Sequence, residues 1–181
     1  MQKILEKFTN PAIVILIAAI LRLVPHLPNF APIGAMALFG GAYLSRKQAL
    51  LLPIAAMVLS DIFIGFDSPA SRISVYGSFA LIVLIGMWLK KHRSFQNVVL
   101  SSLSASVLFF VITNFAVWAF GGFYSQNLAG LVECYTLAIP FFRNTIAGDL
   151  FYTGVFFGGF ELASLLTKQT KYSLIDARRK N

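Results

Sequence analysis

The sequence predicts an all-α membrane protein, a bundle of about six transmembrane helices. Of its 181 residues, 57% are hydrophobic and only 12% are charged, whereas a soluble domain usually carries about 25% charged residues. Long apolar runs alternate with short polar or basic segments, and one membrane-spanning helix needs roughly 20 mainly apolar residues. The chain is long enough for about six such helices and for little else. We therefore expect residues 1–181 to form a single integral membrane domain.

The N-terminal half is expected to contain three helices. Proline is favourable at the first helical position, so the first helix is placed at 11–24, and three further prolines make 25–32 a bend. Residues 33–44 are too few for a full span, but their glycines and alanines allow helices to approach closely. We expect this segment to be buried within the bundle. The third helix is expected at 48–66, followed by a turn at 67–71.

Two more helices are expected before a long connection. The fourth is placed at 75–89, where it meets a basic cluster, and the fifth at 97–120, where it meets two glycines. Residues 121–143 are interpreted as a loop. Part of this loop, 128–139, is apolar enough to form a short helix on the membrane face.

The sixth helix is expected at 144–166, before a polar and basic tail at 167–181. Gly154 and Gly158 have the GxxxG spacing that commonly marks a close helix contact in membranes. Because the sixth helix must already pack within its own chain, we favour an internal contact here over a partner surface.

Lysine and arginine concentrate in cytoplasmic loops of membrane proteins, and this rule orients the bundle. If the N-terminus is cytoplasmic, the outer half keeps only Arg22, Arg72 and Arg143. The other 12 of the 15 basic residues then face the cytoplasm, namely Lys3, Lys7, Arg46, Lys47, Lys90, Lys91, Arg93, Lys168, Lys171, Arg178, Arg179 and Lys180. This bias requires an even number of spans, so both termini are expected to be cytoplasmic.

Polar side chains within or beside the apolar segments fall mostly on the outer half under this topology. An ionisable group at membrane depth costs at least ~2.5 kcal/mol, so such groups tend to face a cavity, pair with each other or serve a function. Asn114 and Trp118 share one helical face and offer an amide and a stacking surface, although ordinary packing explains them equally well. The candidate substrate-binding residues are Arg22, His26, Asn29, Asp61, Asn114, Trp118, Arg143, Asn144 and Asp149.

Two interpretations of the charged candidates stay open. Asp61 and Asp149 both lie near the outer boundary, where each can pair with Arg22 or Arg143 and hold helices together. Alternatively, one arginine remains free for an anionic or polar ligand, since a guanidinium presents several donors. His26 lies between two prolines, where a solvated histidine is favoured over a ligand or a proton relay.

No enzyme, metal or cofactor template is present. The sequence lacks a glycine-rich phosphate loop and the HExxH, GxSxG and CxxC motifs. His26 and His92 are expected on opposite sides of the membrane, and Cys134 is the single thiol, so no metal site is predicted. The formal charge is +8, but the basic residues lie in short clusters without one continuous basic face, which argues against a nucleic-acid partner.

Several motifs stand out along the chain, namely the run from Leu21 to Ala35, the run from Ala37 to Tyr43, Leu59-Ser60-Asp61, Thr113-Asn114-Phe115 and the run from Pro140 to Thr145. With these motifs the sequence resembles a family of small bacterial membrane proteins described as transport proteins of unknown substrate. The resemblance covers nearly the whole chain. More remotely, the size, the six-helix plan and the proline-containing first outer loop resemble the S components of energy-coupling factor (ECF) vitamin transporters.

These resemblances imply a multi-pass protein of the bacterial inner membrane that takes up a small polar, vitamin-like solute through an outer-facing pocket. In S components the ligand lies near the outer face, beneath the first, third and fifth loops. An ECF-type energising module is one implied partner. However, S components dock through an alanine-x-x-x-alanine pattern on the first helix, and the nearest small-residue spacing here is Ala37 with Gly41. A solitary transporter therefore stays open.

Two other functions remain as alternatives. One is a non-transporting scaffold or assembly subunit, in which the polar groups are internal pairs. The other, which we favour least, is a membrane-embedded enzyme acting on lipid or quinone.

Overall fold

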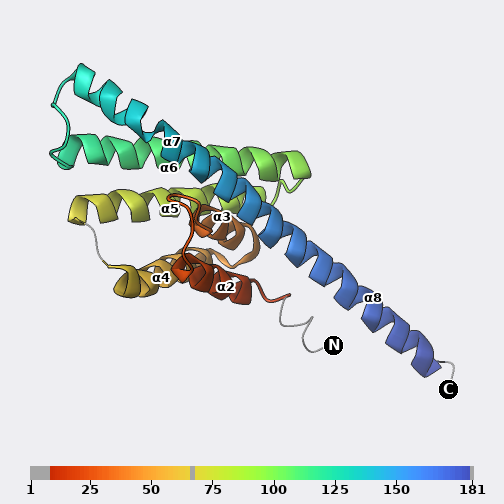
Figure 1. Cartoon of the computed structure of the whole chain (residues 1–181). Helices are drawn as coiled ribbons and strands as arrows, with labels where there is room; N and C mark the ends of the chain where they lie inside the picture. The colour runs from red at the N-terminus through yellow and green to blue at the C-terminus, as the bar shows by residue number, and fades with distance from the viewer. Residues whose placement is uncertain (1–8, 66–67, 180–181) are drawn as a thin grey trace.

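The described part of the chain consists of helices joined by loops. The computed structural model describes residues 9–65 and 68–179, and these residues contain no strand (Figure 1). Four helices are long and apolar enough to cross a membrane, and two shorter apolar helices accompany them. The prediction of an all-α chain with membrane-spanning helices is confirmed at this level.

The first helix, α2 (Pro11–Leu23), begins and ends close to where the sequence predicts. The Asn10 side chain accepts a hydrogen bond from the Ala12 N–H at 3.0 Å, and this bond satisfies one of the N–H groups that a helix start leaves without a partner. The bend over 24–32 follows, and within it Asn29 has a φ of 63°. Asparagine adopts this left-handed conformation more readily than most residues.

Helix α3 (Ile33–Tyr43) lies at the centre of the bundle, which confirms its predicted burial. Every residue from 34 to 42 is buried. The helix packs against α5 (Pro69–Leu89) through two glycines, because a Cβ on Gly86 would lie only 2.9 Å from the Cα of Gly41 and would collide with a backbone carbonyl oxygen of α3. The small residues of this segment thus allow backbone to meet backbone.

Helices α4 (Arg46–Ile64), α5 and α6 (Phe95–Phe120) differ from the predictions mainly at their starts. Helix α5 begins at Pro69 rather than at residue 75, because the Ser68 hydroxyl accepts a hydrogen bond from the Ser71 N–H at 3.2 Å and proline suits the first helical position. The predicted turn at 67–71 is therefore wrong for residues 69–71. Ser68 of that predicted turn is the N-cap of α5, and residue 67 lies outside the described residues. The third helix, expected to reach residue 66, ends instead at Ile64, where Gly65 is the C-cap with a φ of 106°.

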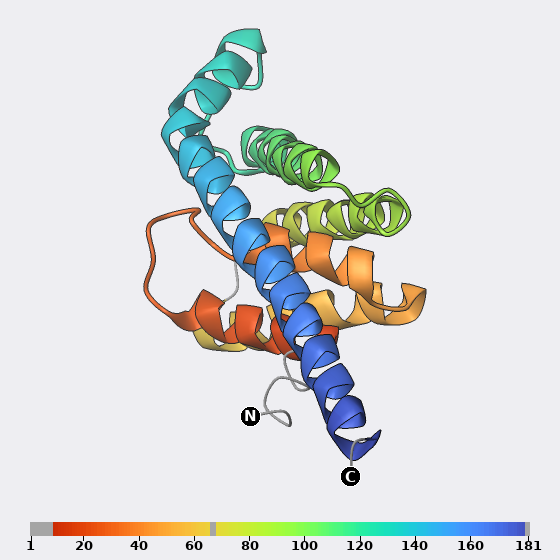
Figure 2. The ribbon, with the colours of Figure 1, turned by 90° about the vertical axis from the view of Figure 1, so that its right-hand side faces the viewer.

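The last helix is much longer than predicted. Helix α7 (Leu128–Thr153) continues through a π-helical turn (Gly154–Gly158) into α8 (Gly159–Arg179), and this rod crosses the other helices obliquely (Figures 1 and 2). The predicted loop over 121–143 is wrong beyond Asn127, whose side chain caps α7 by accepting from the Gly130 N–H at 2.9 Å.

Pro140 lies within α7 without ending the helix, as membrane helices tolerate. The separate short helix expected at 128–139 and the helix start expected at 144 are therefore parts of one element. The predicted tail is helical as far as Arg179.

The prediction that the two glycines of the GxxxG spacing make an internal helix contact is wrong. Gly154 and Gly158 are exposed, and a Cβ on either would meet no described atom within 4 Å. The close glycine contact of the described fold is instead Gly41 with Gly86.

The loops lie at two opposite ends of the bundle. At one end the Lys90 ammonium donates to the Leu44 carbonyl oxygen at 2.9 Å, which joins the loops after α3 and α5. The start of α2 and the end of α8 lie on this same side, opposite the α6–α7 loop (Figure 1). This arrangement suits an even number of spans. Lys3, Lys7 and Lys180, which also entered the orientation argument, lie outside the described residues.

Candidate functional site

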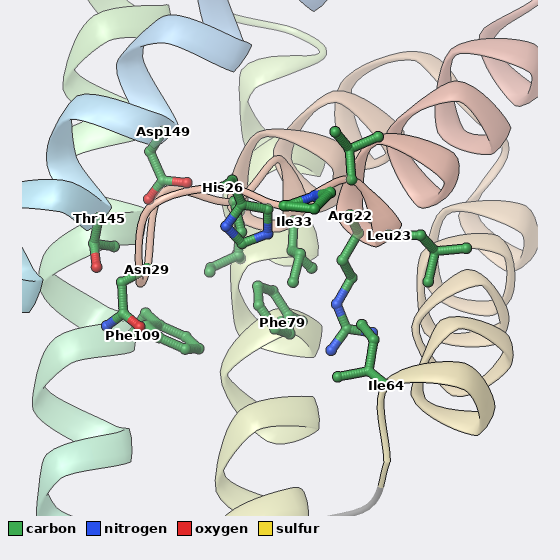
Figure 3. Close-up of a pocket in the computed structure, with 15 residues that line it drawn as sticks. Arg22, Leu23, His26, Asn29, Ile33, Ile64, Phe79, Phe109, Thr145 and Asp149 are labelled. Carbon is green, nitrogen blue, oxygen red and sulfur yellow. The ribbon is translucent and has the colours of Figure 1, made fainter.

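A cavity of about 460 Å³ lies beneath the 24–32 bend. Helices α2 to α7 and the bend all contribute lining residues, so residues far apart in the sequence meet there (Figure 3). Aliphatic and aromatic side chains form most of its wall, and a few polar groups are set among them. The lining residues are Arg22, Leu23, Val24, Pro25, His26, Asn29, Ala31, Ile33, Gly34, Ile64, Phe79, Ile82, Phe109, Thr145 and Asp149.

Arg22 forms one side of the cavity, and its guanidinium is bound by residues of α4. Its guanidinium donates to the Met57 carbonyl oxygen at 3.1 Å and to the Ser60 hydroxyl, and it pairs with Asp61 at 2.5 Å. The Tyr76 hydroxyl also donates to Asp61. The Arg22 and Asp61 side chains are only 14% and 10% exposed, so this is a largely buried ion pair between α2 and α4.

A second, smaller cavity of about 300 Å³ lies on the other side of this pair. Arg22 and Ile64 line both cavities, whereas Asp61 and Arg72 line only the second one.

Asp149 forms the opposite side of the main cavity. It is 5% exposed, and its Oδ2 accepts a hydrogen bond from the Ser106 hydroxyl at 2.7 Å. No described residue donates to its Oδ1. Gly34 of α3 faces this carboxylate so closely that a Cβ there would overlap Oδ1. In Figure 3 Asp149 and the Arg22 guanidinium lie on opposite sides of the labelled group, with Ile33 and Phe79 between them.

The bend supplies the remaining polar groups and is tied to α7. The His26 Nδ1 lies 2.9 Å from the Leu27 carbonyl oxygen. Asn29 also lines the cavity. Outside the cavity, the Asn144 amide donates to the Pro28 carbonyl oxygen at 2.9 Å and fixes the bend against the long helix.

Three of the predicted site residues lie away from this cavity. The Asn114 amide donates to the Phe110 carbonyl oxygen of its own helix at 2.8 Å. Trp118 donates from its indole nitrogen to the Ser125 carbonyl oxygen at 3.0 Å, which secures the α6–α7 loop. Arg143 is exposed on α7 and lines none of the described cavities.

The predicted set therefore divides by position. The main cavity is lined by Arg22, His26, Asn29 and Asp149. Asp61 lies outside the cavity lining and pairs with Arg22, and Asn144 holds the bend against α7.

Sequence reasoning missed most of the wall. Phe79 and Phe109 line the cavity, but as single aromatic residues in apolar helices they resemble any core residue. Ser106 had a usable signal, because it belongs to a serine-rich stretch with Ser101, Ser102 and Ser104 inside an otherwise apolar helix. The described residues contain no group of three or more His, Cys, Asp or Glu side chains that could hold a metal ion.

Comparison with known proteins gives one match. The model of a family described as a family of unknown function, DUF6580, matches residues 2–173. Neither a curated protein nor a solved structure matches the chain.

Proposed function

The chain belongs to the DUF6580 family, and we propose that it is a membrane transport protein that captures a small polar, vitamin-like solute in the cavity beneath the 24–32 bend. The observation that carries this proposal is the cavity itself. Its volume of about 460 Å³ lies within the range of about 300–1,000 Å³ typical of small-molecule sites.

The lining has the composition expected of a ligand site. Such sites combine a mostly apolar wall with a few polar groups that fix the ligand's orientation. Here Phe79 and Phe109 belong to the wall, while Asp149, His26 and Asn29 supply acceptors and donors from two directions. We assign the Arg22–Asp61 pair a shaping role, because Arg22 already bonds to Met57, Ser60 and Asp61.

The proposed setting is the bacterial inner membrane, with both termini cytoplasmic and the 24–32 bend at the outer face. In this orientation the solute reaches the cavity from outside the cell. The burial of Ala37 and Gly41 inside the bundle supports a solitary transporter over one that docks an energising module, because this small-residue pair has no surface to offer a partner.

A scaffold or assembly subunit is the second candidate. The buried Arg22–Asp61 pair suits it, since a scaffold needs its polar groups paired with each other. The void and the Asp149 carboxylate that faces it favour a binding protein instead.

The transport proposal is tested by uptake. A deletion strain is screened on a panel of vitamins and their precursors, and any lost uptake is complemented with the wild type or with Ala31→Trp, which adds an indole to the cavity lining. We expect the wild type to restore the uptake of one compound and A31W to restore at least tenfold less.

Ala147→Trp is the matched control, because Ala147 is exposed on α7 and lies outside the cavity lining. Both variants must be present in the membrane at wild-type abundance. Unchanged uptake of every compound in the deletion strain, or full complementation by A31W, contradicts the proposal.

A further inference from the structure

The main cavity holds one charge that the protein does not balance. Its charged lining residues are Arg22 and Asp149. Arg22 is neutralised by Asp61 at 2.5 Å, so its charge does not balance the charge of Asp149 on the opposite wall. Among the described residues, the one polar partner of Asp149 is the neutral Ser106 hydroxyl, and no cation pairs with it.

A carboxylate in this position needs compensation. The free-energy cost of burying an unpaired ionised group is large enough to shift the group's protonation in protein interiors. Asp149 is only 5% exposed, and it lines the cavity. Either a proton or a cationic group of the ligand must therefore neutralise it.

The surroundings of Asp149 are built to keep it facing the cavity. Ser106 holds Oδ2 from the α6 side. Gly34 leaves just enough room on the α3 side, because a Cβ at that position would overlap Oδ1. The remaining oxygen is thus left for a donor that comes from the cavity.

Taking the proposed function as its basis, we propose that the solute is an organic cation. Its protonated amine or an equivalent cationic N–H group would bind the Asp149 carboxylate, and its apolar part would rest against Phe79 and Phe109. Charge-assisted hydrogen bonds of this kind are among the strong ones, and aromatic faces also attract cations. An anionic solute would be repelled by Asp149 and would find Arg22 already engaged.

The test compares amines with carboxylates of matched shape. The purified full-length chain in lipid nanodiscs is titrated with benzylamine and tryptamine, and with phenylacetate and indole-3-acetate, while thermal unfolding is followed. We expect millimolar amines to raise the unfolding temperature and the matched carboxylates to leave it unchanged. In Asp149→Asn the affinity for the amines should fall at least tenfold.

A variant far from the cavity serves as the control. Glu161→Gln removes an exposed carboxylate at the other end of the bundle and should leave amine binding unchanged. If D149N does not fold, the comparison of amines with carboxylates on the wild type still decides the question.

Equal or stronger binding of the carboxylates, no shift with either amine, or amine binding that is unaltered in a folded D149N each overturns the cation assignment. The proposed transport function is tested independently of the cation assignment. Its uptake assay compares the wild type with A31W, and it uses whichever compound the deletion strain fails to take up.

Discussion

Arg22→Ala is expected to destabilise the protein by about 3–5 kcal/mol, the usual cost of breaking a buried ion pair by removing one partner. The substitution leaves the Asp61 carboxylate, which is 10% exposed, without its cation. It also removes the donors to Met57 and Ser60. The measurement is the free energy of unfolding of purified protein in mixed micelles.

Two further variants separate the pair from its surroundings. Glu161→Gln breaks the Arg93–Glu161 ion pair, whose side chains are 40% and 58% exposed, and should cost less than about 1 kcal/mol. The double variant Arg22→Met with Asp61→Leu should be more stable than R22A, since it leaves no unpaired charge. A loss below about 1 kcal/mol in R22A would show that the pair does not hold α2 to α4.

Gly86→Ala is expected to destabilise the fold by about 1–3 kcal/mol or more, as overpacking of a close contact does. A Cβ at this position would collide with the Leu38 carbonyl oxygen and lie 2.9 Å from the Gly41 Cα. These are backbone atoms, so no side-chain rotation relieves the clash. Helices α3 and α5 would have to move apart, and the measurement is again unfolding in mixed micelles.

Gly77→Ala is the matched control on the same helix. A Cβ on Gly77 meets no described atom within 4 Å, and alanine has the higher helix propensity. The free energy of unfolding of G77A should therefore equal that of the wild type or be slightly higher. If G86A and G77A unfold alike, the glycine contact between α3 and α5 does not contribute to stability.

The parts of the fold that were predicted correctly depend on local chemistry. The prolines at 25, 28 and 32 forbid a continuous helix, so the bend was readable. The glycines and alanines of α3 indicated close packing, and α3 is buried on all sides. Grouping costly polar residues by membrane depth also placed Arg22, His26, Asn29 and Asp149 at one level, and all four line the cavity.

The errors arose where tertiary structure overrides local signals. Pro140 and the mixed residues of 121–143 suggested a loop, yet membrane helices accommodate proline and α7 runs through it. Asn114 and Trp118 share a helical face and a depth with the cavity residues, but α6 meets the start of α7 there through contacts such as Tyr135 to the Val111 carbonyl oxygen. The position of a residue along its helix does not determine which neighbouring helix that residue contacts.

The walls of the cavity were beyond sequence reasoning for a similar reason. Phe79 comes from α5 and Phe109 from α6, and each is an ordinary apolar residue until the helices are packed together. The partner of Arg22 was also undecided in the sequence, because Asp61 and Asp149 were equally placed in depth. The α2–α4 contact brings Asp61 to Arg22, whereas Asp149 meets Ser106.

The central claim is that the cavity beneath the 24–32 bend holds a small solute, and native mass spectrometry tests it most directly. The wild type, A31W and A147W are incubated with a small-molecule extract of the growth medium and measured as intact complexes. We predict one additional small mass per chain on the wild type and on A147W, and none on A31W. A wild type that carries no small molecule, or an A31W that carries the same one, would contradict the account.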